Sequence, residues 1–132
     1  MPVIELTLAA TPKVCFDTFL DLASARHWVP GLKKLRIVRS DEKGRPLEVL
    51  YEFGDDLTYA LVYAYDDKRS LVRWVPSAGV LDGVSGWATF EAHEGGCRFR
   101  YALESMKGRA KEHPQAVADA FKAWVLKRVT AS

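Results

Sequence analysis

The order of hydrophobic periodicities constrains this chain more than any other feature of its sequence. One segment with alternating apolar residues comes first, a short helical pattern follows, six alternating segments come next, and a long amphipathic pattern ends the chain. Alternation with a period of two indicates strands, and apolar residues spaced three and four apart indicate helices. Strands joined in series by short connections pair mostly with their sequence neighbours, which favours an antiparallel sheet.

Clusters of turn-forming residues, such as His93-Glu94-Gly95-Gly96, separate the predicted strands. Gly and Asp in such clusters tolerate the backbone angles that a reversal of chain direction needs. A sheet of seven strands is too wide to lie flat, so we expect it to twist and curve. The strands are expected over Val3–Ala10, Lys33–Ser40, Leu47–Phe53, Leu57–Tyr65, Leu71–Val75, Val84–Ala92 and Cys97–Leu103.

Helical patterns lie between the first two strands and at the end of the chain. Thr11-Pro12 begins the first helix, because threonine suits the N-cap and proline suits the first helical position. A second short turn of helix is expected over Ser24–Trp28, and Pro30-Gly31 ends it. The last helix is expected over Pro114–Val129, with one broad apolar arc.

Together these elements predict an α+β fold. A curved, seven-stranded antiparallel sheet would wrap around the long C-terminal helix, with one or two short helices between the first and second strands. The 132 residues leave room for a single domain, 1–132. A sheet curved in this way tends to enclose a cavity, and a cavity indicates a ligand.

Composition excludes several classes of function. The 19 basic and 17 acidic residues leave a net charge of +2, which is too balanced for the basic face that nucleic acid requires. The N-terminus lacks the basic and apolar regions of a signal peptide, and no run reaches the roughly 18 apolar residues of a membrane span. We therefore expect a cytoplasmic protein that does not bind nucleic acid.

The sequence predicts no metal, no cofactor and no catalytic constellation. His27, His93 and His113 are far apart, and none pairs with a cysteine or carboxylate at ligand spacing. The sequence contains no glycine-rich phosphate loop and no Ser/His/Asp arrangement. In a reducing compartment, Cys15 and Cys97 are expected to be small buried apolar groups rather than a disulfide.

Aromatic residues are the main candidates for the lining of a cavity. Tyr and Trp combine a large apolar area with one hydrogen-bonding tip, which suits an amphiphilic ligand. Plain core packing is the alternative, and we expect it to hold for more than half of them. The candidate ligand-binding residues are Trp28, Tyr51, Phe53, Tyr59, Tyr63, Trp74, Trp87, Phe99, Tyr101, Phe121, Trp124 and Arg128.

Two polar candidates each have a second interpretation. Arg128 falls within the apolar arc of the last helix and could bind a ligand carboxylate or carbonyl, but we favour a packed alkyl stem with its charge in water. His27 is the best candidate for general acid–base chemistry, because imidazole is the side-chain group suited to proton transfer at neutral pH, but we favour a partly exposed histidine at a helix end.

Several motifs resemble, in order along the chain, those of one known superfamily. Phe19-Leu20-Asp21-Leu22 and His27–Lys34 resemble its helix-to-strand signature, and Ser85-Gly86-Trp87 and Gly95–Tyr101 resemble its penultimate hairpin. The resemblance is to the START-like (SRPBCC) superfamily, in its polyketide cyclase/dehydrase and lipid-transport branch near the coenzyme Q-binding and ribosome-association toxin groups. It implies a helix-grip fold with an apolar cavity between the sheet and the C-terminal helix. Members of the superfamily bind or transform lipids, quinones, sterols and polyketides.

The inward face of two predicted strands stays open. In the sixth strand, periodicity favours Val84, Ala88 and Phe90 inward, whereas the family pattern favours Trp87. In the fourth strand, both the face with the tyrosines and the opposite face, which carries Ala and Val, qualify as the interior.

Three functions agree with these expectations. Our first hypothesis is a carrier or sensor that binds a small lipophilic molecule (lipid, quinone or polyketide-like), as a monomer or homodimer. The second is a cyclase, aromatase or dehydratase that acts on a polyketide-like substrate. The third is a protein-interaction module of the ribosome-association toxin type. Lys107, Arg109 and Lys111 allow at most transient membrane contact, and we favour an ordinary solvated loop.

Overall fold

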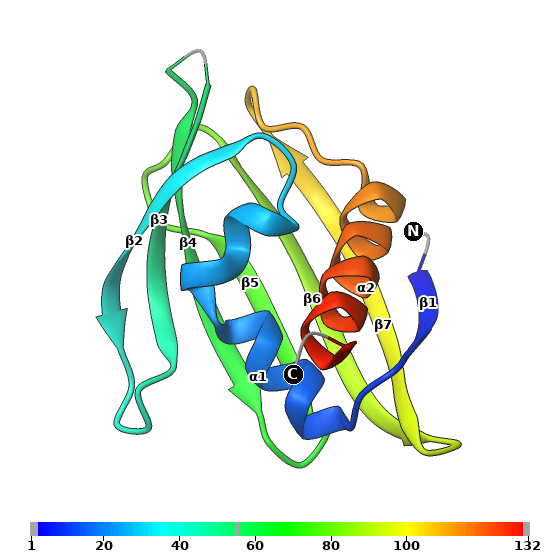
Figure 1. Cartoon of the computed structure of the whole chain (residues 1–132). Helices are drawn as coiled ribbons and strands as arrows, with labels where there is room; N and C mark the ends of the chain where they lie inside the picture. The colour runs from blue at the N-terminus through cyan, green and yellow to red at the C-terminus, as the bar shows by residue number, and fades with distance from the viewer. Residues whose placement is uncertain (1–2, 55, 131–132) are drawn as a thin grey trace.

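The computed structural model of the chain describes residues 3–54 and 56–130, and its strands form one seven-stranded antiparallel sheet (Figure 1). The strands are β1 (Val3–Leu8), β2 (Leu32–Ser40), β3 (Pro46–Phe53), β4 (Thr58–Asp66), β5 (Leu71–Pro76), β6 (Gly83–His93) and β7 (Gly96–Lys107). The helices are α1 (Pro12–Leu20), the 3₁₀ helix η1 (Leu22–His27) and α2 (Pro114–Thr130). The predicted α+β class, a curved sheet against a C-terminal helix, is confirmed.

The strand order is β1-β7-β6-β5-β4-β3-β2. From β2 to β7 each strand pairs with the next one along the chain, and only β1 crosses to the far edge, where it pairs with β7. The chain makes that crossing through α1 and η1, which lie in front of the sheet beside α2 (Figure 1). The helices therefore cover one face of the sheet, and the core lies between them and that face.

The first helix begins as its sequence predicts. The Thr11 hydroxyl accepts a hydrogen bond from the Val14 amide at 3.2 Å, and Pro12 is the first helical residue. These two residues satisfy one amide and remove another at the helix end, where amides have no partner within the helix.

The pairing of β6 with β7 extends beyond the predicted strands. β7 continues to Lys107 rather than ending at Leu103, because its last residues pair with the start of β6, where Gly83 lies opposite Lys107. The apolar alternation stops before the hydrogen-bonded ladder does, so the sequence pattern marks the buried part of the strand and misses its exposed end.

A register shift in this pairing depends on one glycine. The shift falls between Ser85 and Gly86. A Cβ atom on Gly86 would lie 2.3 Å from the Ala102 carbonyl oxygen and 3.0 Å from the Trp74 ring. Only a residue without a side chain lets the backbone of β7 and the Trp74 ring approach this closely.

α2 is anchored by one fully buried ring. α2 packs against β1 and β7, and the ring centre of Phe121 lies 5.4 Å from that of Phe19, 4.9 Å from Trp28 and 5.0 Å from Phe99. Complete burial of a phenylalanine side chain stabilises a fold by about 1.5–3 kcal/mol. Phe121 therefore joins the helix to α1, to the residue that follows η1 and to the sheet at one point.

The later turns of α2 are attached to the segment around η1. Trp124 stacks on His27 with ring centres 4.2 Å apart and planes 1° apart. One turn further on, Arg128 forms an ion pair with Asp21 at 3.1 Å. Both contacts lie towards the surface, outside the core.

The uncovered face of the sheet carries charged side chains. Arg100 on β7 pairs with Glu5 on β1 at 2.9 Å, and Arg73 on β5 pairs with Glu104 on β7 at 3.0 Å. Such exposed pairs contribute about 0–1 kcal/mol each. These ion pairs indicate that the uncovered face of the sheet is in contact with water.

Candidate functional site

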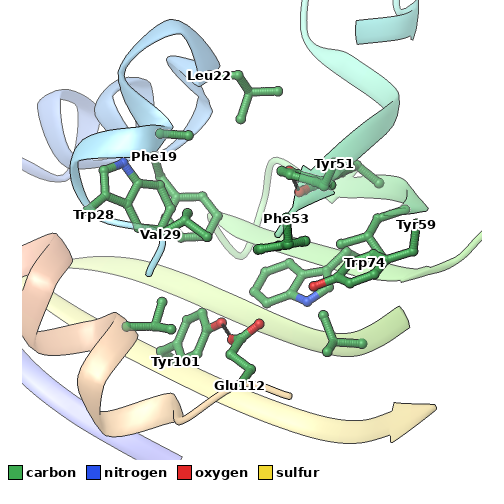
Figure 2. A pocket seen from close by; sticks show the side chains of 15 residues that line it. Phe19, Leu22, Trp28, Val29, Tyr51, Phe53, Tyr59, Trp74, Tyr101 and Glu112 are labelled. Carbon is green, nitrogen blue, oxygen red and sulfur yellow. Dashed lines mark hydrogen bonds between the residues drawn. The ribbon is translucent and has the colours of Figure 1, made fainter. Parts of the chain in front are cut away.

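A cavity lies between the covered face of the sheet and the helices, close to the start of α2. Its open space is about 60 Å³, and a second hollow of about 90 Å³ adjoins it and shares part of its lining. Side chains from η1, from the central strands and from the connection before α2 surround it (Figure 2). They are Phe19, Leu22, Ala25, Trp28, Val29, Tyr51, Phe53, Tyr59, Leu61, Tyr63, Trp74, Val84, Tyr101, Glu112 and Val117.

Most of the aromatic residues proposed from the sequence line this cavity. They are Trp28, Tyr51, Phe53, Tyr59, Tyr63, Trp74 and Tyr101. In β4 the tyrosine face is the inner one. Tyr59 and Tyr63 on that face are buried, whereas Ala64 on the opposite face is exposed. The packing of the helices on that face resolves the alternative that the sequence left open.

Trp87 does not line the cavity, and the inward orientation that the family pattern favoured is wrong. Ala88 and Phe90 are buried, as periodicity alone predicted. Successive side chains of a strand point to opposite faces, so Trp87 lies on the outer face. There it borders a shallow groove together with Arg73.

The other four candidates also lie outside the cavity lining. Phe99 and Phe121 are fully buried and pack against each other in the core. Trp124 stacks on His27 instead of facing the cavity. Arg128 lies at the surface, because Asp21 holds its guanidinium there.

Two tyrosine hydroxyls in the cavity wall form a pair. Tyr51 on β3 and Tyr63 on β4 are both buried, and their hydroxyls are hydrogen-bonded to each other. Tyr59 is buried as well, but within the described residues its hydroxyl has no hydrogen-bond partner. The wall therefore combines one internally satisfied pair with one hydroxyl that remains available.

Glu112 adds a carboxyl group to this polar part of the lining. The Tyr101 hydroxyl donates a hydrogen bond to the Glu112 carboxylate, as the dashed line in Figure 2 marks. Burial raises the pKa of Glu112, and the hydrogen bond from Tyr101 offsets only part of that rise. Among the described residues, no lysine, arginine or histidine forms an ion pair with Glu112.

The tyrosines around the carboxyl group keep their protons at neutral pH. Burial is the largest cause that raises the pKa of Tyr51, Tyr59, Tyr63 and Tyr101. The charge of Glu112 raises the pKa of Tyr51, Tyr59 and Tyr101 further, so the carboxylate lies near all three phenols. The site thus offers neutral hydroxyl groups around one acid.

The connection between β7 and α2 places Glu112 against the cavity. The Arg109 amide donates to the Asp82 carboxylate, and the Glu112 amide donates to Met106 Sδ at 3.3 Å. Gly108 has a φ of +66°, and a Cβ atom there would collide with Asp82. A glycine in the left-handed region therefore allows the connection to close over the loop before β6.

The sequence interpretation missed Glu112. It treated the charged connection as a solvated loop, which holds for the exposed Lys107 and Lys111 but not for Glu112. One acidic residue among basic neighbours carries no signal of burial, since nothing local requires its side chain to turn inward.

The open space at this site is small for a ligand site. Ligand pockets commonly measure about 300–1,000 Å³, whereas the cavity and the adjoining hollow measure about 60 and 90 Å³. A water molecule needs about 10–15 Å³ on this measure, so together the two spaces hold on the order of ten to fifteen atoms other than hydrogen. The geometry suits a small molecule with one polar end.

Other reactive groups lie away from the cavity or are shielded. His27 is exposed and does not line it. Within the described residues, no three His, Cys, Asp or Glu side chains gather where a metal ion could bind. Cys15 and Cys97 are free thiols and fully buried. The chemistry available inside the cavity is therefore that of the tyrosines and Glu112.

No described helix combines the length and apolar character needed to cross a membrane.

Comparisons with known proteins bear on the fold. No family model matches the chain, and no curated protein matches its sequence. Its structure is similar to that of a START superfamily protein from Mycobacterium smegmatis, with 13% sequence identity, a TM-score of 0.76, and coverage of 96% of this chain and 97% of that chain. It is also similar to the Zhui aromatase/cyclase from Streptomyces sp. R1128, with 15% identity, a TM-score of 0.68, and coverage of 97% and 94%.

A third similar structure is the di-domain ARO/CYC StfQ from the steffimycin biosynthetic pathway. The identity is 12% and the TM-score 0.71, and the match covers 98% of this chain and 46% of StfQ. At these identities the shared property is the arrangement of the sheet and helices. The chain has the START-like (SRPBCC) helix-grip fold.

Proposed function

We propose that this chain binds a small amphipathic molecule in the cavity between sheet and helices, as a carrier or sensor. The observation that carries the proposal is the composition of the lining, in which aromatic rings surround most of the space and two hydrogen-bonded pairs, Tyr51–Tyr63 and Tyr101–Glu112, supply the polar groups. Ligand sites commonly combine apolar walls, which supply affinity, with a few polar groups, which set orientation.

Apolar contact alone supplies modest affinity in a space of this size. A ligand no larger than an aromatic side chain buries on the order of 150 Å². At about 25 cal/mol per Å² this burial contributes about 4 kcal/mol, which corresponds to a dissociation constant of roughly 1 mM. The loss of translational freedom opposes that gain. The polar end of the ligand therefore decides which molecule is retained.

A cavity-filling substitution tests the proposal. Val84 is buried and lines the cavity, so Val84→Phe puts a larger side chain into the open space. Val75 on the neighbouring strand is 45% exposed, which makes Val75→Phe the matched control. Binding is measured by native mass spectrometry of protein purified from cells, and by thermal shift across a panel of amphipathic compounds of about ten to fifteen heavy atoms.

We expect a bound mass or a thermal shift with the wild type and with Val75→Phe, and its loss with Val84→Phe. Circular dichroism confirms that each variant is folded. A wild-type protein that carries no bound molecule and shows no shift with any compound of the panel would refute the proposal.

A second candidate is a cyclase, aromatase or dehydratase activity. The hydrogen bond between Tyr101 and Glu112 favours it, because a phenol and a carboxyl group of raised pKa can exchange protons with a bound substrate. A space for about ten to fifteen atoms does not enclose a polyketide chain, so we place binding first. Mass spectrometry of a linear poly-β-ketone incubated with the protein tests this candidate, and turnover that is absent, or unchanged in Glu112→Gln, counts against it.

A further inference from the structure

The cavity contains one formal charge that its wall does not balance. Glu112 is the only acidic residue in the described lining, no basic residue lines the cavity, and no described cation pairs with Glu112. We infer that the ligand is an organic cation, a monoamine or a quaternary ammonium, whose charged end lies against Glu112 and the surrounding rings. This inference rests on the proposed function and names the ligand class of the same site.

Glu112 is half-buried, and the cost of taking its carboxylate partly out of water favours a positive ligand. A carboxylate removed from water without a counter-ion is destabilised, and the raised pKa of Glu112 reflects this loss of hydration. An ammonium group supplies the missing charge and converts the half-buried carboxylate into an ion pair. A neutral ligand leaves the carboxylate uncompensated, and an anionic ligand places a second negative charge beside it.

The rings near Glu112 attract a cation for an independent reason. The rings of Trp74 and Tyr101 lie 5.6 Å apart, and those of Phe53 and Tyr59 lie 5.1 Å apart. The faces of Trp and Tyr attract a cation within about 6 Å of the ring centre, and the attraction is stronger where water is excluded. The unpaired Tyr59 hydroxyl can also accept a hydrogen bond from an ammonium group.

The position of Glu112 sets the orientation and the size of the ligand. Glu112 lines both the cavity and the adjoining hollow, so it lies where the two meet. An ammonium at this junction leaves the inner space for an apolar group. Lys111 and His113 are exposed and line the outer hollow, where Lys111 repels a second positive charge. The site therefore fits a monoamine of about ten heavy atoms rather than a polyamine.

Three probes of similar shape separate charge from size. Phenethylamine, 2-phenylethanol and phenylacetate each carry a phenyl ring on a short chain, which ends in an ammonium, a hydroxyl or a carboxylate. Isothermal titration calorimetry at neutral pH measures their affinity for the wild type, for Glu112→Gln and for Glu42→Gln. Glu112→Gln keeps an oxygen that accepts the Tyr101 hydrogen bond and removes the charge. Glu42 is exposed in the turn between β2 and β3, so Glu42→Gln is the matched control.

We expect the wild type and Glu42→Gln to bind phenethylamine at least about tenfold more tightly than 2-phenylethanol, with phenylacetate the weakest. In Glu112→Gln the amine and the alcohol should bind with similar affinity. A purely structural role of Glu112, in which it only holds the connection through Tyr101, predicts no such change, because glutamine keeps that acceptor.

The wild-type comparison tests the inference even if Glu112→Gln does not fold. Equal affinity of the wild type for the amine and the alcohol, or an unchanged preference in a folded Glu112→Gln, overturns the inference and leaves the proposed function standing. The same holds if none of the three probes binds while neutral compounds of the panel do. Failure of every compound overturns both.

Discussion

The hydroxyl pair of Tyr51 and Tyr63 allows a quantitative test of how the cavity wall is stabilised. The two hydroxyls are each other's hydrogen-bond partner, and both side chains are buried. Replacement of one tyrosine by phenylalanine removes one hydroxyl and leaves the other without its partner. Replacement of both removes the whole pair and keeps the shape of the wall.

The expected magnitudes follow from this geometry. An orphaned buried hydroxyl costs about 1–3 kcal/mol, whereas loss of both partners is close to neutral. The open space beside the pair can admit a water molecule, so we expect the lower part of that range, about 1–2 kcal/mol for Tyr51→Phe or Tyr63→Phe. The double variant should lose less than about 1 kcal/mol.

Urea unfolding followed by tryptophan fluorescence gives the free energy of unfolding of the wild type, the two single variants and the double variant. The four values form a double-mutant cycle. Tyr59→Phe is the control, because it makes the same chemical change in the same wall to a hydroxyl that has no partner among the described residues. Its effect should stay within about 0.5 kcal/mol.

The reasoning fails if the effects of Tyr51→Phe and Tyr63→Phe add to within about 0.5 kcal/mol in the double variant. It also fails if Tyr59→Phe costs as much as either of them. Either result would mean that these hydroxyls contribute to stability through packing or contact with water rather than through the hydrogen bond between Tyr51 and Tyr63.

Three further predictions concern the anchor of α2, the close approach at β6 and the buried acid. Phe121→Ala should lose about 3–5 kcal/mol of unfolding free energy, as measured by urea unfolding. Its control, Lys122→Ala, should lose less than about 0.5 kcal/mol. Similar losses in the two variants would mean that Phe121 does not anchor the helix. Gly86→Ala should lose more than about 1 kcal/mol, because its Cβ must displace the Ala102 carbonyl, and an unchanged thermal midpoint would contradict this contact. The pKa of Glu112 in the folded state lies above its ordinary value of 4.5, so its contribution to stability is full below that pH and is lost as the pH rises through the raised pKa. Glu112→Gln does not ionise, so urea midpoints should show it gaining stability relative to the wild type as the pH rises above 4.5. A difference that stays constant with pH would mean that burial does not perturb the carboxyl group.

Periodicity predicted the strands because, in the central part of the sheet, side chains on one face are buried and those on the other face are less so. Where both faces carry apolar residues, as in β4, alternation identifies the strand but not its inner side. Tyr59 and Tyr63 face the cavity because the helices pack on that side of the sheet. In β6 alternation placed Ala88 and Phe90 correctly, and the family pattern misplaced Trp87, because a pattern shared across distant relatives does not fix the register of one strand.

The polar part of the site was less predictable. The aromatic lining follows from residue types that favour interiors. The position of Glu112 depends instead on contacts between distant segments, because Asp82 accepts a hydrogen bond from the connection between β7 and α2, and Tyr101 donates one to the Glu112 carboxyl group. Arg128 shows the same limit. Its place in the apolar arc was read from the sequence, but its ion pair with Asp21 involves a residue near the other end of the chain. Pairings of this kind leave no local pattern.

The attachment of α2 to the rest of the molecule is uneven along its length. Phe121, Trp124 and Arg128 bind its middle and final turns to α1 and to the segment around η1, whereas its opening turn borders the hollow beside Glu112. The buried Val117 and Ala118 follow directly on that opening turn, so a tilt of the whole helix would expose core side chains to water. A guest can therefore gain room only beside the first turn, in the outer hollow, and the cohesion of the fold is secured further along the helix.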